Sequence, residues 1–373
     1  MSPPNRVRAA VDEGPRHEIG PQTSGNGRDP ALLGSYVLPG GVRDPRPALG
    51  QAAAAEAIGL GTVWIGERYD TKDLPSLAGA LTQRTSTVRI GAAVTHTSLR
   101  HPMVLASMGQ TLQALSGGRF LLGIGRSAPW RWRDYGLPAP TLASLGDTAE
   151  VLRRLWRGET VHYEGPAGHF PNLRLPQRPD VDPPPLLLAA VGPKTLALAG
   201  RCFDGVVLHP FLTPEATARS IAIVRDAARR AGRDPARVLA YAAVVVAPDL
   251  DEATTRLAVH ARAAGYFHVA GLGDALVAAN GWDPADLARY RAEPALASLG
   301  DRQADKALSR AELVQLAGRL PAHWLTSAAA SGTAADCARR LGEYLDAGAD
   351  ELVLHGTTAE RLGPLVAAFG PPR

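Results

Sequence analysis

The sequence of 373 residues is poor in cysteine and in long apolar runs, and both shortages exclude classes of protein. It has two cysteines, Cys202 and Cys337, which cannot build a disulfide framework. The longest apolar runs, at 186–191 and 238–247, are far shorter than the roughly 20 residues of a membrane-spanning helix. We therefore expect a cytoplasmic protein with no membrane partner.

Lysine is also scarce, because only Lys72, Lys194 and Lys306 stand among the forty basic residues. The formal net charge of +4 is spread along the chain, and no run of five or six basic residues occurs. Abundant alanine, glycine, proline and arginine are typical of a GC-rich genome, so we attribute the basic balance to codon usage. A nucleic-acid partner is not expected.

Familiar catalytic motifs are missing as well. The sequence has no HExxH, CxxC, GxSxG or Walker A motif, so zinc proteolysis, thiol redox chemistry, serine esterase chemistry and P-loop phosphoryl transfer lose their usual support. The ten histidines show no metal-ligand spacing, and no metal site is expected. Residues 1–29 have no apolar segment of a signal peptide and are expected to be a disordered tail.

From residue 30 to residue 373 the sequence predicts one domain in which short β-rich runs alternate with amphipathic helical segments. Eight strands with helices between them predict an α/β fold, the (β/α)8 or TIM barrel, and an open doubly wound sheet is the alternative. The predicted strands are 32–38, 62–65, 88–94, 120–124, 186–190, 205–208, 238–246 and 351–354. The predicted helices are 47–57, 74–83, 102–115, 144–156, 193–199, 214–231 and 334–347.

Two connections are longer than a barrel requires. Residues 163–185 hold seven prolines and are expected to form a long loop, a kind of segment that often serves as a lid. Residues 249–330, between strands seven and eight, are expected to form a helical cap. Trp282 and Trp324 in this insertion are expected to pack within the cap, the alternative being an apolar substrate pocket.

Polar residues follow several predicted strands, where a barrel has its active-site mouth. Glu67-Arg68 follows the second strand and His96 the third. Two places suit a phosphate: Gly125-Arg126-Ser127 after the fourth strand, and Gly192-Pro193-Lys194 at the start of a helix. The alternatives are an ordinary strand-end ion pair at Glu67, a solvated charge at Arg126 and a tight turn at Gly192. Gly123 and Gly125 alone are a weak dinucleotide motif.

The succession of these segments resembles the luciferase-like family of flavin and deazaflavin (F420) oxidoreductases over about residues 32–246 and the final strand. The matching pieces are Glu67-Arg68, 91–96, Arg100-His101-Pro102, 115–119, 123–126, 189–194 and Asp204-Gly205. The resemblance implies a (β/α)8 barrel and a non-proline cis peptide at Ala93-Val94 that lies against the cofactor ring. It further implies that Ala190, Val191, Gly192, Pro193, Lys194 and His209 border the cofactor.

The expected cofactor is coenzyme F420, because the segment from 187 to 194 and Asp204-Gly205 look most like F420-dependent members of this family. An F420 enzyme passes a hydride between the deazaflavin C5 and a small organic substrate. An FMN-dependent monooxygenase that uses O2 is the alternative, favoured by Arg126, and a binding barrel without turnover is the third possibility. Glucose 6-phosphate is not expected as substrate. At the end of the second strand, family members that oxidise sugar phosphates have a pair that resembles Asp-His, whereas this sequence has Glu67-Arg68.

His96 is the first choice for the acid or base that handles a substrate proton, with Glu67 orienting it or holding the substrate. The alternative for His96 is a hydrogen-bonding wall residue of the cofactor pocket. The expected partners are a small-molecule substrate and, in a homodimer, a second copy of the chain; the sequence leaves the oligomeric state open.

Overall fold

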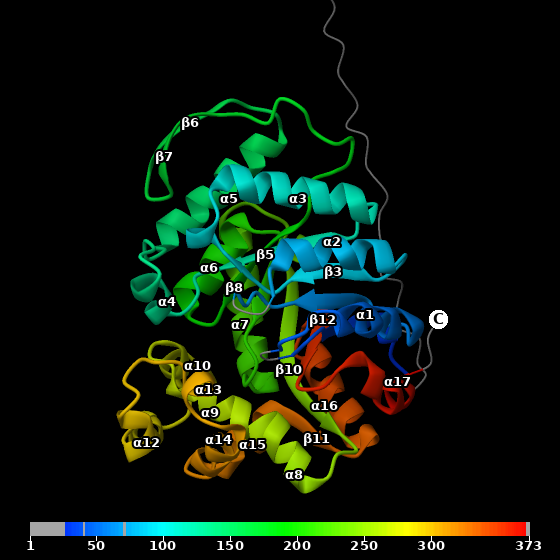
Figure 1. Cartoon of the computed structure of the whole chain (residues 1–373), viewed down its shortest axis with the longest axis vertical. Helices are drawn as coiled ribbons and strands as arrows, with labels where there is room; N and C mark the ends of the chain where they lie inside the picture. Colours follow the sequence, from blue (N-terminus) through cyan, green and yellow to red (C-terminus); the bar gives the residue numbers. More distant parts are fainter. Residues whose placement is uncertain (1–26, 40–41, 70–71, 371–373) are drawn as a thin grey trace, which may run out of the picture.

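The computed structural model describes residues 27–39, 42–69 and 72–370, and its centre is a closed barrel of eight parallel strands (Figure 1). The closure is complete because β9 pairs with β10, and β12 pairs with both β10 and β1. This confirms the predicted (β/α)8 barrel and excludes the open sheet. The barrel strands are β1 (Leu33–Tyr36), β2 (Thr62–Ile65), β3 (Arg89–Ala92), β5 (Phe120–Gly125), β8 (Leu186–Ala190), β9 (Gly205–Leu208), β10 (Leu239–Pro248) and β12 (Glu351–His355).

Helices cover the outside of the barrel, and several begin where the sequence predicts them (Figure 1). The starts of α2 and α7 are fixed by a proline in the first turn and by a capping side chain that accepts a backbone N–H. The capping residue is Asp73 for α2 and Thr213 for α7. The main helices are α1 (Pro47–Ala57), α2 (Leu74–Arg84), α3 (Pro102–Ser116), α5 (Leu142–Trp156), α6 (Pro193–Cys202), α7 (Pro214–Arg230), α16 (Ala334–Asp346) and α17 (Gly363–Phe369). Short 3-10 turns are η1 (Pro30–Leu32), η2 (Thr97–Leu99), η3 (Pro235–Arg237) and η5 (Ala359–Arg361).

The amino end of the barrel interior is filled. Glu351 at the start of β12 is buried and accepts hydrogen bonds from Thr62 Oγ1 at 3.1 Å, Trp64 Nε1 at 3.2 Å and the Arg89 guanidinium. The Trp64 ring in turn packs edge-on against Tyr241 at 5.2 Å. Because this end is filled by the hydrogen-bonded Glu351 carboxylate and by aromatic rings, a ligand of the barrel has access from the carboxyl ends of the strands.

The insertion after β10, here called the cap, is helical as predicted, and it lies below the barrel in Figure 1. Trp282 stacks on Trp324 at 4.8 Å and 8°, and Phe267 packs against both, so the tryptophans form the core of the cap as expected. Strand β11 (Ala329–Gly332), which ends the cap by pairing with β10, was not predicted. The cap elements are α8 (Glu252–Thr255), the π-helical turn η4 (Arg256–His260), α9 (Ala261–His268), α10 (Leu272–Asn280), α11 (Pro284–Arg291), α12 (Pro294–Ala297), α13 (Ala304–Ala307), α14 (Arg310–Ala317) and α15 (Ala322–Ala328).

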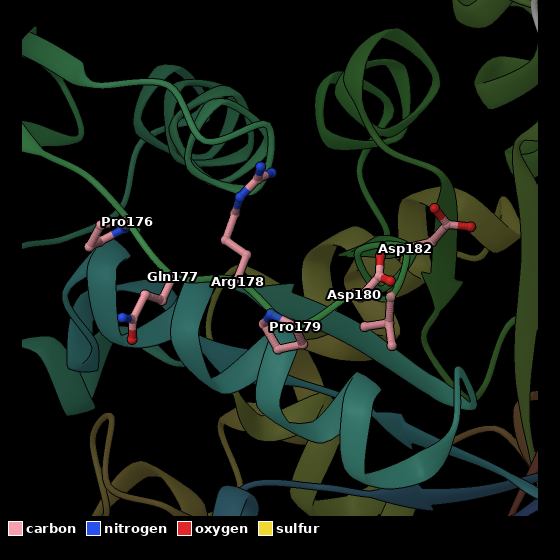
Figure 2. Close-up of a pocket in the computed structure, with 7 residues that line it drawn as sticks. Pro176, Gln177, Arg178, Pro179, Asp180 and Asp182 are labelled. Atoms are coloured by element: carbon pink, nitrogen blue, oxygen red, sulfur yellow. The ribbon is translucent and has the colours of Figure 1, made fainter.

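The expected loop at 163–185 is wrong in its first half, which belongs to a hairpin of β6 (Val161–Gly165) and β7 (Gly168–Leu173). The second half surrounds a hollow of about 830 Å³ lined by residues 176–182 (Figure 2). Arg178 there donates to the carbonyl of Trp156 at the end of α5. Because this segment leads into the first residue of β8, it lies at the amino end of the barrel, away from the mouth. The hairpin before it reaches the start of α3, where the Phe170 ring lies 5.0 Å from that of His101, and a lid role for 163–185 stays a prediction.

The tail expected at residues 1–29 lies outside the described residues apart from 27–29. Arg28 forms an ion pair with Asp346 at 2.7 Å, and its backbone N–H donates to Phe369 at 2.9 Å. In the part of the chain that the structure describes, no helix has the length and apolar character needed to cross a membrane.

Candidate active site

The segment after β3 carries the cis peptide bond that the resemblance implies, between Ala93 and Val94. Two neighbouring strands hold it, because Tyr36 Oη donates to the Ala93 carbonyl at 3.1 Å and the Ala93 N–H donates to Ile65 at 2.9 Å. The chain then returns to the barrel as the short strand β4 (Thr95–His96), which pairs with the end of β5. The bulge between β3 and β4 therefore lies at the mouth of the barrel.

Val94 packs directly over the two glycines at the end of β5. A Cβ added to Gly123 would lie 2.1 Å from the Ala92 carbonyl oxygen, and one added to Gly125 would lie 2.7 Å from Val94 Cγ2. Both positions therefore require glycine for the close approach of the bulge. This steric requirement accounts for Gly125 without a phosphate.

Glu67 is buried at the end of β2 and belongs to an ion pair with Arg100. Arg100 binds both carboxylate oxygens, at 2.7 Å for the Nη2–Oε1 contact, and Thr95 Oγ1 donates to Oε2 at 2.6 Å. Among the described residues no hydrogen bond joins Glu67 to His96, so the expected orientation of the imidazole by this carboxylate is not found. The contacts of Glu67 instead fix Thr95 and hence β4.

His96 bonds through Nδ1 to the hydroxyl of Tyr69, a residue that sequence reasoning missed. The Arg131 guanidinium lies 5.5 Å from the Tyr69 ring. Burial, with the charges of Arg131 and Arg100, lowers the pKa of His96 to about 3, and burial raises the pKa of Tyr69. Both groups are therefore neutral near pH 7, which favours the wall-residue interpretation of His96 over a role as cationic acid.

This low pKa predicts an effect on acid stability. Since His96 is neutral in the folded state down to about pH 3 but binds a proton near its usual pKa of 6.5 when unfolded, the free energy of unfolding falls as pH drops below about 6.5. We expect His96→Gln to reduce this slope by about one proton between pH 6 and pH 4, measured by urea unfolding across that range. An unchanged slope would contradict the neutral assignment; exposed His169, replaced by glutamine, is the control.

The two phosphate candidates differ in what already surrounds them. Gly192 opens α6 without a side-chain cap, and a Cβ there would meet nothing within 4 Å. Lys194 is exposed and has no partner among the described residues. Arg126, in contrast, lies 5.5 Å over the Trp132 ring, and the Ser127 hydroxyl accepts from Arg131 at 3.4 Å. The start of α6 is thus the more open of the two.

The remaining residues of the predicted pocket lie at the ends of neighbouring strands. Ala190 ends β8 in a buried position, Val191 follows it half-buried, and Pro193 begins α6. His209 follows β9, and its ring lies 4.6 Å from that of Tyr266 on α9. Burial lowers the pKa of His209 to about 4, so this imidazole is also neutral.

The cap is bound to the loops of the mouth by charged contacts. Arg68 pairs with Asp305 at 2.9 Å, and Arg133 on α4 (Pro129–Asp134) pairs with Asp301. Lys306 lies 5.9 Å from the Trp130 ring on the same short helix. The cap thereby places residues of α9 and α13 next to the barrel ends. Sequence reasoning did not identify Lys72, Arg262 or Tyr266 as residues of this region. Their side-chain types were the only indication in the sequence that they could belong to a site.

The described residues contain no group of three or more histidine, cysteine, aspartate or glutamate side chains that could hold a metal ion. The candidate site is made of neutral side chains that form hydrogen bonds or ring contacts, the cis-peptide bulge, the open N-terminus of α6 and several cationic side chains. This set suits an organic cofactor with an anionic tail.

Comparisons with known proteins agree with this geometry. The chain is 29% identical over 305 residues to a 5,10-methylenetetrahydromethanopterin reductase of Methanolobus tindarius, covering 81% of this chain and 87% of that protein. It is 32% identical over 196 residues to an F420-dependent glucose-6-phosphate dehydrogenase of Nakamurella multipartita, covering 49% and 58%.

Among solved structures, the coenzyme F420 dependent tetrahydromethanopterin reductase of Methanopyrus kandleri superposes with a TM-score of 0.72 at 21% identity. The match covers 91% of this chain and 97% of that one, and it shows the shared fold. The family model described as luciferase-like monooxygenase matches residues 23–351. The chain belongs to the luciferase-like monooxygenase family.

Proposed function

We propose that the protein is an oxidoreductase that binds coenzyme F420 at the barrel mouth and transfers a hydride between the deazaflavin C5 and a small organic substrate. The observation that carries the proposal is the open start of α6, where Lys194 has no partner within the described part of the chain, on the same barrel mouth as the Ala93-Val94 bulge. Relatives named as F420-dependent enzymes support this choice of cofactor.

The residues present fit such a cofactor. Ala93 and Val94 offer a wall of small apolar side chains for a ring, and Gly192, Pro193 and Lys194 offer a helix start and a cation for the phosphate. When bound, F420 supplies or accepts the hydride. Neutral His96 and Tyr69 hold a fixed hydrogen bond beside the bulge, and His209 adds a neutral ring from β9. The homodimer stays a prediction.

The second candidate is an FMN-dependent monooxygenase. One observation favours it: Arg126 is an exposed cation at the end of β5, suited to a terminal phosphate. The cation–π contact with Trp132, a residue of α4, holds this guanidinium against that helix.

A titration of the purified protein distinguishes these cofactors. We expect deazaflavin fluorescence to change on saturable binding of F420, with an affinity well above that for FMN measured by flavin fluorescence in the same buffer. Tight binding of FMN with no response from F420 would overturn the proposal. Binding of F420 with no redox reaction across a broad panel of alcohols, aldehydes and activated alkenes would instead support a barrel without turnover.

Replacing Lys194 tests the phosphate assignment. We expect Lys194→Ala to weaken F420 binding by about 1.5–3 kcal/mol, because a charge-assisted hydrogen bond to the phosphate is lost. Arg201→Ala, which removes an exposed cation from the other end of the same helix, is the control and should leave the affinity unchanged. Wild-type affinity in Lys194→Ala would show that the phosphate binds elsewhere.

A further inference from the structure

A cluster of basic groups lies where cap helix α9 meets the barrel, and neither the ion pairs nor the proposed cofactor contacts use it. It consists of Arg262 on α9, Lys72 after β2 and His355 at the end of β12. Arg262 donates to the Ala258 carbonyl at 3.0 Å. No carboxylate lies within ion-pair distance of it among the described residues.

Lys72 also lacks a carboxylate partner among the described residues. Its side chain is buried, and Nζ donates to the Leu38 carbonyl at 2.6 Å without any described carboxylate partner. Burial and the charge of Arg68 lower the pKa of Lys72 to about 8. Burying a charged group without a counter-ion is costly, and a ligand that supplies the opposite charge would offset this cost.

His355 connects the two cations to the barrel. Its ring lies 4.6 Å from Tyr36, and its buried Nδ1 has no hydrogen-bond partner among the described residues. Burial holds the pKa of His355 well below its usual value, and the charges of Arg262, His209, Lys72 and Arg68 lower it further. Among the described residues, His355 Nδ1 has no hydrogen-bond partner and neither cation has a carboxylate partner, so an anionic acceptor suits all three groups.

The position of the cluster separates it from the phosphate cradle. Around the closed barrel the strands follow the order β1, β2, β3, β5, β8, β9, β10 and β12, which places β1 opposite β8. Tyr36 and His355 end β1 and β12, whereas Lys194 follows β8. One cofactor phosphate held at Lys194 therefore leaves this basic cluster on the other side of the mouth.

We propose that Arg262, Lys72 and His355 bind a carboxylate or phosphate group of the substrate, so that the enzyme acts on an anionic molecule. The inference rests on the proposed function only in calling this molecule the substrate. The same anion chemistry occurs in the tail of F420, and the experiment has to separate these two sources. The π-helical turn η4 directly precedes α9, and such turns are frequent at functional sites.

The test measures binding of inorganic phosphate by calorimetry to the full-length protein saturated with F420. Arg262→Met keeps much of the aliphatic volume but removes the charge. We expect it to weaken phosphate binding at least tenfold while F420 affinity is unchanged. Arg256→Met, which removes an exposed arginine from η4, is the control. Lys72→Met provides a second variant with the same expectation if Arg262→Met does not fold.

Each other result overturns the proposal. Phosphate that does not bind, or binds equally well to Arg262→Met and Lys72→Met, means that the cluster is not an anion site. A loss of F420 affinity in these variants assigns the anion to the cofactor. The phosphate titration is repeated without F420 in the Lys194→Ala background. Failure of F420 to bind would then defeat the proposed function, while the phosphate result alone decides the anion site.

Discussion

Arg100→Met is expected to lower the free energy of unfolding by about 3–5 kcal/mol, because it leaves the Glu67 carboxylate buried without its partner. The Glu67 side chain has no exposed surface and that of Arg100 is 12% exposed, so solvent cannot replace the lost contacts. Thr95 alone would remain as a side-chain donor to the carboxylate. Urea unfolding of the variant and the wild type measures the difference.

Two further variants show whether the pair acts as a unit. The double variant Glu67→Leu with Arg100→Met removes both charges and is expected to recover much of the lost stability. Asp73→Asn removes the charge from the outer contact of Arg100, at 3.2 Å to a half-exposed carboxylate, and keeps an amide oxygen that can cap α2, so it should cost less than about 1 kcal/mol. A fully stable Arg100→Met protein would contradict the positioning role of Glu67 and return this carboxylate to the list of catalytic candidates.

The sequence predicted the barrel because each of its strands is an apolar run followed by a turn or helix signal. It also placed the cis peptide at Ala93-Val94, through the resemblance of the surrounding segment. It could not predict the partner of Glu67. Arg100 stands 33 residues further along the chain, and only the return of β4 to the barrel brings the two together.

Tertiary contacts decide the other differences too. Strand β11 is a short run of alanine, serine and glycine with weak strand propensity, and it forms because the extended end of β10 offers a free edge. Tyr69, Lys72 and Arg262 carry no local pattern that marks them as site residues. Their meeting at the mouth depends on how the cap is bound to the loops by pairs such as Arg68 with Asp305.

The glycines beneath the cis bulge give the second large effect. We expect Gly123→Ala to lose at least about 3 kcal/mol of unfolding free energy, because the new Cβ would lie 2.1 Å from a backbone oxygen that cannot turn aside. Gly125→Ala should cost less, about 1–3 kcal/mol, since its Cβ meets the Val94 side chain at 2.7 Å. Unfolding in urea and F420 titration are measured on both variants.

The difference between the two contacts makes a rescue experiment decisive. Val94→Ala removes the methyl groups that Gly125→Ala would strike, so the double variant should regain most of the stability and F420 affinity lost by Gly125→Ala. The same Val94→Ala change should not rescue Gly123→Ala, whose obstacle is the Ala92 carbonyl. If Val94→Ala rescued neither glycine variant, the side chain of Val94 would not be the group that β5 accommodates. If F420 affinity stayed normal in a folded Gly125→Ala protein, the bulge would not form a wall of the cofactor pocket.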